Sequence, residues 1–235
     1  MAINSTKLTL IVCTIDNEEV LSRHIGQLIS VSSKVSYHVE ILVVLGGDAV
    51  APRFNSLPTN IIYNYLPEAE KGVYHAFNTG IDNAIGEFSY FANVGDRLTY
   101  LPLSLPQETD LISFPVTICD NHFNHIFTRY PNDAKYIVPH HQGVFLKTFL
   151  YRKFRFNTAY SSAADLDLLI QIKKENLSAS HRDCEPPISL FTLGGISSSR
   201  NFYSIFSRKI QRFQIILRNR YVLLWFKFIL ARLFL

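Results

Sequence analysis

Apolar residues in the first hundred positions follow two alternating spacings, one typical of buried strands and one typical of helices. Short apolar or alternating runs predict β-strands at residues 7–14, 39–45, 60–66 and 88–93. Between them, apolar residues recur every three or four positions and predict helices at residues 16–32 and 72–85. Strands that alternate with helices in this way are typical of a mostly parallel sheet covered by helices.

Polar residues follow three of these predicted strands, at residues 14–17, 46–48 and 93–96. In open α/β sheets, ligands bind beyond the carboxyl ends of the parallel strands, so we expect a binding site at this edge. Gly86, just after the second predicted helix, fits the left-handed position that commonly ends a helix.

The spacing changes after residue 110. Two apolar runs, at residues 111–119 and 122–129, flank Asp120-Asn121 and predict an antiparallel hairpin. A further helix is predicted at residues 163–172 and a last strand at residues 188–193. A helical segment rich in basic residues then closes the chain.

The 235 residues carry a formal charge of +4, which is distributed unevenly. All 19 acidic residues lie at or before Glu185, so residues 1–185 have a net charge of −4, whereas the last 50 residues hold eight basic residues and no acid. We therefore expect an acidic catalytic or binding body followed by a basic tail that contacts something anionic. The three scattered cysteines exclude a disulfide framework and indicate a reducing compartment.

The basic tail, residues 201–235, also contains Tyr221, Trp225 and many Phe and Leu side chains. From residue 208 onward its longest uncharged run, Tyr221–Phe226, is far shorter than the roughly 20 apolar residues that a membrane-spanning helix needs. Basic and aromatic residues interleaved in this way are typical of a helix that lies on an anionic membrane surface. The alternative is a helix packed on the domain or in a dimer. Nucleic acid is not expected as a partner, because many bulky aliphatic side chains would then face water.

Four segments, in order, resemble glycosyltransferase family 2, in the branch that builds bacterial surface polysaccharides. They are LTLIVCTIDNEEVL at residues 8–21, EKGVYHAFNTGIDNAIGEFSYFANVGD at 70–96, HQGVFLK and YSSAADLDLLIQI at 141–172, and LGGIS at 193–197. The resemblance covers about residues 7–200. It implies a GT-A fold over residues 1–200, a Rossmann-like mixed and mostly parallel sheet flanked by helices, with residues 201–235 as a basic amphipathic tail.

The resemblance implies that Asp96 binds a divalent cation, Mn²⁺ or Mg²⁺, together with the phosphates of a nucleotide sugar. Relatives carry paired acids in this motif, whereas here it reads Asn93-Val94-Gly95-Asp96. One carboxylate can suffice, because Mg²⁺ often takes phosphate and water as its other ligands. The alternative role of Asp96 is to cap a turn.

The resemblance also places the general base at Asp165. An inverting transfer needs a carboxylate that takes the proton of the acceptor hydroxyl as it attacks the anomeric carbon. Asp167 lies two residues further on and therefore points to another side of the helix. The alternative for Asp165 is a helix N-cap, a role for which Ser161 and Ser162 compete.

Further residues of the matched segments are expected to bind the nucleotide sugar. Thr14 and Asp16 either border the nucleotide or cap the next helix. Relatives carry an Asp at the end of the second strand, where Leu45 stands here; Asp48 either replaces that Asp or is only a turn residue. The remaining residues expected at the site are Lys71, which could pair with a phosphate, Asn78, which could instead brace the Asp96 loop, and Asn93, His141 and Gln142.

Together these patterns predict an inverting glycosyltransferase that moves a sugar from a nucleotide-sugar donor to a lipid-linked saccharide acceptor. The expected context is bacterial O-antigen, capsule or exopolysaccharide synthesis, with the body in the cytoplasm and the tail on the inner face of the cell membrane. No signal peptide is expected, because residues 1–6 carry no basic residue and the apolar run at residues 8–13 is too short. The alternative is a degenerate, non-catalytic GT-A protein that binds a nucleotide or a partner transferase. A nucleotidyltransferase is disfavoured, because residues 10–19 hold no Gly-rich loop with Arg and Lys.

Overall fold

The computed structural model describes residues 6–193 and 202–219. Two of the segments singled out above therefore lie outside the described residues. They are Gly194–Ser197 of the last matched motif and the uncharged run Tyr221–Phe226. The expected domain boundary, between residues 200 and 201, also lies outside the described residues.

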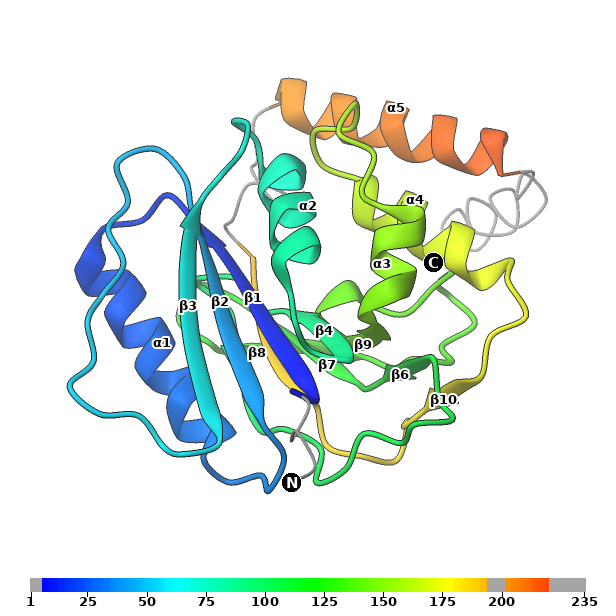
Figure 1. Cartoon of the computed structure of the whole chain (residues 1–235). Coiled ribbons are helices and arrows are strands. Elements are labelled where there is room, and N and C mark those ends of the chain that lie inside the picture. The colour runs from blue at the N-terminus through cyan, green and yellow to red at the C-terminus, as the bar shows by residue number, and fades with distance from the viewer. Residues whose placement is uncertain (1–5, 194–201, 220–235) are drawn as a thin grey trace.

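A seven-stranded sheet, ordered β10-β6-β9-β4-β1-β2-β3, forms the centre of the molecule (Figure 1). Its strands are β1 (Leu8–Thr14), β2 (Val39–Leu45), β3 (Ile61–Pro67), β4 (Phe88–Phe91), β6 (Leu111–Ser113), β9 (Val144–Lys147) and β10 (Ala179–His181). β1 to β4 run parallel, and β9 runs antiparallel between β4 and β6. The predicted mixed, mostly parallel sheet is confirmed.

Helices cover both faces of this sheet, since alternate residues of each buried strand point to opposite sides. Leu10 and Val12 of β1 pack in the core under α1, whereas Ile11 packs in the core under α2, α3 and α4. The four helices are α1 (Glu18–Ser32), α2 (Val73–Asn83), α3 (Thr148–Phe154) and α4 (Ala164–Lys173). Figure 1 shows α1 on one side of the sheet and α2 and α3 on the other.

A second, four-stranded sheet has the order β5-β11-β7-β8. Its strands are β5 (Arg97–Leu98), β7 (Val116–Cys119), β8 (His125–Arg129) and β11 (Ser189–Thr192). The sequence pattern predicts one strand over residues 111–119, and this is wrong. The chain changes sheets at Phe114–Pro115, because Pro115 has no N–H to continue the first ladder. The hairpin itself is confirmed, as β7 pairs antiparallel with β8.

Gly86 does not adopt the expected left-handed conformation, which among the described glycines occurs at residues 47, 72 and 95. The fold requires glycine at this position because glycine has no side chain. A Cβ at Gly86 would lie only 2.4 Å from the backbone nitrogen of Thr9, and the Gly86 N–H donates to the Thr9 hydroxyl. The glycine therefore allows the chain that leaves α2 to pass close against β1.

The helix α5 (Phe202–Arg218) lies over α4 across one end of the molecule (Figure 1). Ile215 is fully buried against the body, and Gln211 hydrogen-bonds Ser161 and Ser162 in the loop before α4. A stripe at intervals of three or four residues is 38–56% exposed; we call it the α5 stripe, and it comprises Phe206, Ile210, Phe213 and Leu217. Within the described residues, no helix combines the length and apolar character needed to cross a membrane.

Candidate active site

Asp165 lies in the first turn of α4 with its carboxylate engaged by two side chains. The Nδ1–H of His141 donates to its Oδ2 at 3.2 Å, and the hydroxyl of Tyr74 donates to its Oδ1 at 3.4 Å. The N-cap of α4 is Ala163, and its side chain makes no capping bond. The alternative in which Asp165, Ser161 or Ser162 caps this helix is therefore wrong.

Burial alone would raise the pKa of Asp165, but the hydrogen bond and positive charge of His141 lower it to about 2. The side chains of His141 and Asp165 are 21% and 29% exposed, so both reach the surface. Asp165 is thus an ionised carboxylate at neutral pH, as a proton acceptor must be, and it can be approached from solvent.

Two aromatic side chains, His140 and Phe191, pack against the ring of His141. It stacks on the ring of His140 with centroids 5.0 Å apart, and Phe191 of β11 packs against both rings. Burial holds the pKa of His140 well below its ordinary value, so that His140 is neutral at pH 7. The next residue, Gln142, is 1% exposed, and its carbonyl accepts hydrogen bonds from Tyr90 and Ser189. Gln142 therefore lies in the core beneath His141 and anchors the turn.

Asp96 occupies the loop between β4 and β5, and its surroundings differ from those of Asp165. Its Oδ1 accepts a hydrogen bond from the backbone N–H of Thr192 at 3.0 Å, and no cationic side chain of the described residues forms an ion pair with it. Burial raises the pKa of Asp96 to about 7, against the opposing effect of the nearby His141. Asp96 and Asp165 thus approach His141 from different elements of the fold.

A divalent cation can be accommodated at Asp96. Asp96 is a half-buried carboxylate with no cationic partner among the described residues, and it lies near Asn93, which is also polar and half-buried. In the described part of the chain, no three His, Cys, Asp or Glu side chains gather closely enough to hold a metal ion. Asp96 therefore fits a cation whose remaining ligands are phosphate oxygens and water, and it does not fit an all-protein metal cage.

Thr14 and Asp16 form a local turn at the end of β1. The Thr14 hydroxyl donates to the Asp16 carboxylate at 2.8 Å and accepts from the Asp16 N–H at 2.9 Å. Asn17, not Thr14 or Asp16, caps α1 by accepting from the N–H of Val20. The alternative in which Thr14 or Asp16 caps this helix is wrong, and both stay at the edge where a ligand is expected.

Glu68 lies at the sheet edge where a ligand is expected, and the sequence analysis does not name it. It follows β3 directly, and its carboxylate covers Gly46 so closely that a Cβ there would lie 3.0 Å from it. Burial and the charge of Glu68 raise the pKa of Cys13. Asp48, by contrast, is exposed in the turn after β2. The sequence could have indicated Glu68, because it follows a predicted parallel strand. The same criterion identified the polar residues after the other three strands.

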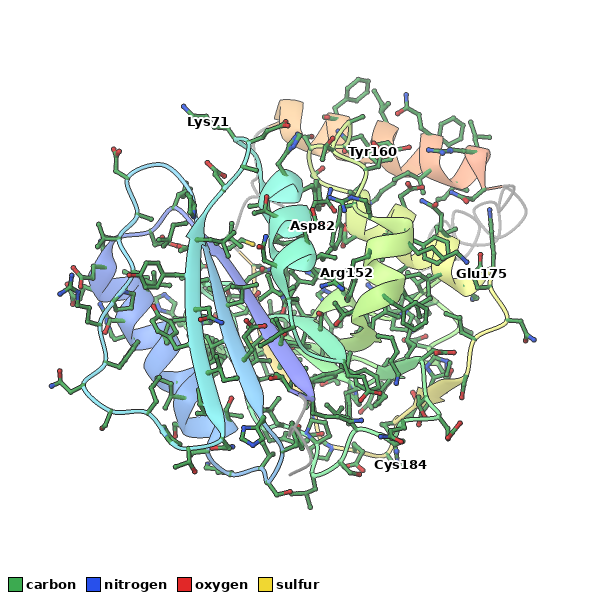
Figure 2. The ribbon with its side chains drawn as sticks, viewed as in Figure 1. Lys71, Asp82, Arg152, Tyr160, Glu175 and Cys184 are labelled. Atoms are coloured by element: carbon green, nitrogen blue, oxygen red, sulfur yellow. The ribbon has the colours of Figure 1, made fainter. Side chains whose placement is uncertain are left out.

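Two expected site residues lie further from the carboxylates. Asn78 is buried, with its amide donating to the carbonyl of Phe156 and accepting from the N–H of Phe156. It thus braces α2 against the segment after α3, not against the Asp96 loop. Lys71 extends outward at the tip of the loop between β3 and α2 (Figure 2).

Among solved structures, several glycosyltransferases share this arrangement of sheet and helices. S. aureus TarS residues 1–349 in complex with UDP matches with a TM-score of 0.59 and 14% identity, over 80% of this chain and 61% of that one. The mannosyltransferase PcManGT from Pyrobaculum calidifontis, in complex with GDP-Man and Mn²⁺, matches with a TM-score of 0.56 and 15% identity, over 92% and 64%. The chain has the GT-A fold.

This GT-A chain spans about three fifths of the length of the structures it resembles. TarS 1–349 in complex with UDP-GlcNAc matches with a TM-score of 0.54 and 15% identity, over 83% and 61%. At these identities the likeness establishes the fold alone. No family model matches the sequence, and no curated protein matches it.

Proposed function

We propose that this protein is an inverting glycosyltransferase of the family 2 type that transfers a hexose from a nucleotide sugar to a lipid-linked saccharide. The observation that carries the proposal is the approach of Asp96 and Asp165 to His141, at the end of a GT-A sheet where β1, β2 and β3 present their carboxyl ends. The donor complexes of TarS and PcManGT support a nucleotide sugar as the donor.

Each carboxylate has its own role in this proposal. Asp165 takes the proton of the acceptor hydroxyl while the acceptor oxygen forms a bond to the anomeric carbon on the face opposite the leaving group. The bond from that carbon to the nucleoside diphosphate breaks, and the diphosphate leaves with the electron pair. His141 holds the Asp165 carboxylate in place, and a cation at Asp96, Mn²⁺ or Mg²⁺, would supply positive charge near the leaving diphosphate.

The donor nucleotide lies along the ends of β1 to β4 in this proposal. Thr14, Asp16 and Asn93 border it. Glu68, which lies over Gly46, accepts a hydrogen bond from the base in place of the acid that Leu45 replaces. Asp48 and Lys71 lie at the exposed rim of this edge and reach only the outer parts of the nucleotide.

Nucleotide binding is testable by thermal stabilisation. Because a ligand stabilises the folded state by mass action, UDP or GDP and their sugars should raise the melting temperature, and more so with Mn²⁺ or Mg²⁺. D96N should lose the cation-dependent part of the shift, whereas the matched variant D48N should keep it. Equal cation dependence in wild type and D96N would contradict the role of Asp96.

We further propose that the α5 stripe lies on the anionic inner leaflet of the cell membrane, which brings the site to a lipid-linked acceptor of surface-polysaccharide synthesis. Ile215 faces the body while the α5 stripe faces solvent, and the exposed Lys209 flanks the stripe. An apolar stripe bordered by basic residues is the pattern of an interfacial helix.

This membrane role can be tested in the full chain, because α5 also packs on the body and should not be deleted. F206S/L217S should reduce sedimentation with phosphatidylglycerol vesicles at least fivefold. F149S is the matched control, since Phe149 of α3 is as exposed as Phe206. Unchanged binding of F206S/L217S, or an equal loss in F149S, would overturn the role of the α5 stripe.

A degenerate, non-catalytic GT-A protein is the competing proposal, and the single-acid metal motif is what favours it. The two proposals differ in turnover. A protein that binds nucleotide but releases no nucleoside diphosphate from any nucleotide sugar, with a membrane fraction as the source of acceptor, would favour the non-catalytic protein.

A further inference from the structure

Arg129, at the end of β8, is a half-buried arginine that forms no ion pair with a side chain of the described residues. Its guanidinium stacks over the ring of Tyr136, with its carbon 3.8 Å from the centroid, and its Nη2 donates to the carbonyl of Val138 at 2.5 Å. Its Nε is buried and has no hydrogen-bond partner among the described residues. A buried donor without a partner is costly, so this nitrogen indicates a missing acceptor.

A second arginine, Arg212 of α5, lies within electrostatic range of Arg129 and of His140. Its side chain is exposed, and it lies one helical turn before the fully buried Ile215, near the edge of the α5 face that adjoins the body. Its neighbour Gln211 fastens this part of α5 to Ser162, in the loop before Asp165. Within the described residues, neither arginine forms an ion pair with a carboxylate.

The charges around these arginines favour an anion. Asp133 and Asp165 are the acids that act on Arg129 at longer range, and Asp165 is already paired with His141. Two guanidinium groups near each other repel unless an anion lies between them, and arginine forks match the oxygens of a phosphate. The local excess of positive charge thus favours a phosphate or diphosphate as a ligand.

We propose that Arg129 and Arg212 form a subsite for the phosphate or diphosphate that joins the acceptor saccharide to its lipid, an inference that rests on the proposed function. Both arginines lie on the side of Asp165, which the acceptor hydroxyl must approach, and not on the ends of β1 to β4 where the donor nucleotide lies.

The position of α5 supports a lipid as the source of this anion. Figure 1 shows α5 running across the end of the molecule where β3 leads into α2, above α4. The exposed Arg212 lies within electrostatic range of Arg129 and His140 of the body, and the α5 stripe lies on the same helix. A chain attached to a phosphate held by Arg212 would therefore leave the subsite beside an apolar, membrane-facing helix.

The test is binding of inorganic diphosphate to the full-length protein in EDTA, by calorimetry. Wild type should bind, and R212Q should weaken the affinity at least tenfold; R129Q should do the same, with R129K as the variant that keeps the charge if R129Q folds poorly. K209Q is the matched control, because Lys209 lies on the same helix but beside the α5 stripe. Unchanged affinity in R212Q, or an equal loss in K209Q, would overturn the subsite.

Two further arms distinguish the possible sources of the anion. Saturating UDP or GDP with Mn²⁺ should leave diphosphate binding unchanged, and displacement would assign the subsite to the donor instead. Farnesyl diphosphate should bind at least tenfold more tightly than inorganic diphosphate, and equal affinities would overturn the lipid source. A wild type that binds diphosphate in the expected pattern but binds no nucleotide sugar would contradict the proposed function and still support the anion subsite.

Discussion

Asp96 lies in a loop and Asp165 in the first turn of α4, and each carboxylate is partly shielded from water. The pKa values of the two carboxylates nevertheless move in opposite directions. Asp165 has His141 beside it, and its pKa is lowered to about 2. Among the described residues, Asp96 has hydrogen bonds from Thr192 and a more distant His141, and burial raises its pKa to about 7. Both carboxylates are affected by burial, so the neighbouring charge decides in which direction each pKa moves. Within the part of the chain that the structure describes, Asp165 has a positive partner, whereas Asp96 lacks one.

The largest effect is expected from D165N, which removes the proton acceptor and keeps the shape of the side chain. Turnover should fall by about 10²- to 10⁴-fold, the usual contribution of a general base, while nucleotide still stabilises the protein. D167N is the matched control, because Asp167 lies two residues on and contacts Gln171 and Asn219 instead. Turnover that survives in D165N, or is lost equally in D167N, would remove Asp165 from the chemistry.

The next effect is on stability, and it concerns Asp96. The unfolded chain releases this proton near the ordinary value of 3.8 and the folded protein near 7, so the folded state binds more protons in between. Stability therefore falls as the pH rises through this window. In EDTA, D96N should be more stable than wild type, by a margin that grows by about 2–3 kcal/mol between pH 5 and pH 8 and is constant above. Urea unfolding at four pH values measures the difference in free energy of unfolding between D96N and wild type. A difference that stays constant with pH would show that burial does not raise the pKa of Asp96.

H141Q should have a smaller effect that sharpens the comparison, because it makes Asp165 resemble Asp96. Without the imidazolium charge, burial should raise the pKa of Asp165, so the loss of turnover on acidification should begin at a higher pH. We expect about a tenfold loss at pH 7. The pH–rate profile is the measurement, and an acid limb at the wild-type position would mean that His141 does not set the charge state of Asp165.

Y74F should have the smallest effect, about a twofold loss of turnover. The Tyr74 hydroxyl lies 3.4 Å from Asp165, at the long end of a hydrogen bond, so little stabilisation depends on it. Initial rates of wild type and Y74F under the same conditions provide the check. A loss as large as that of H141Q would show that Tyr74 orients the carboxylate as strongly as His141 does.

Much of the fold can be predicted from the sequence, because the spacing of apolar residues is a local property. The strand bounds of β1 and β2 agree with the predicted runs to within a residue, and α1 ends at Ser32 as expected. The failures occur where distant segments meet. The strand predicted across Pro115 divides between two sheets, and Gly86 is required by its close approach to Thr9.

The sequence by itself determined the alternation of strands and helices and singled out Asp96 and Asp165 as candidate site residues, since both properties are carried by short stretches of chain. Only the tertiary structure decided which partner each carboxylate has. The pairing of His141 with Asp165, the position of Glu68 over Gly46 and the approach of Arg212 to Arg129 join residues that lie at least 22 positions apart. Such contacts depend on how sheets and helices pack, and the charge and pKa of a buried group follow from those contacts.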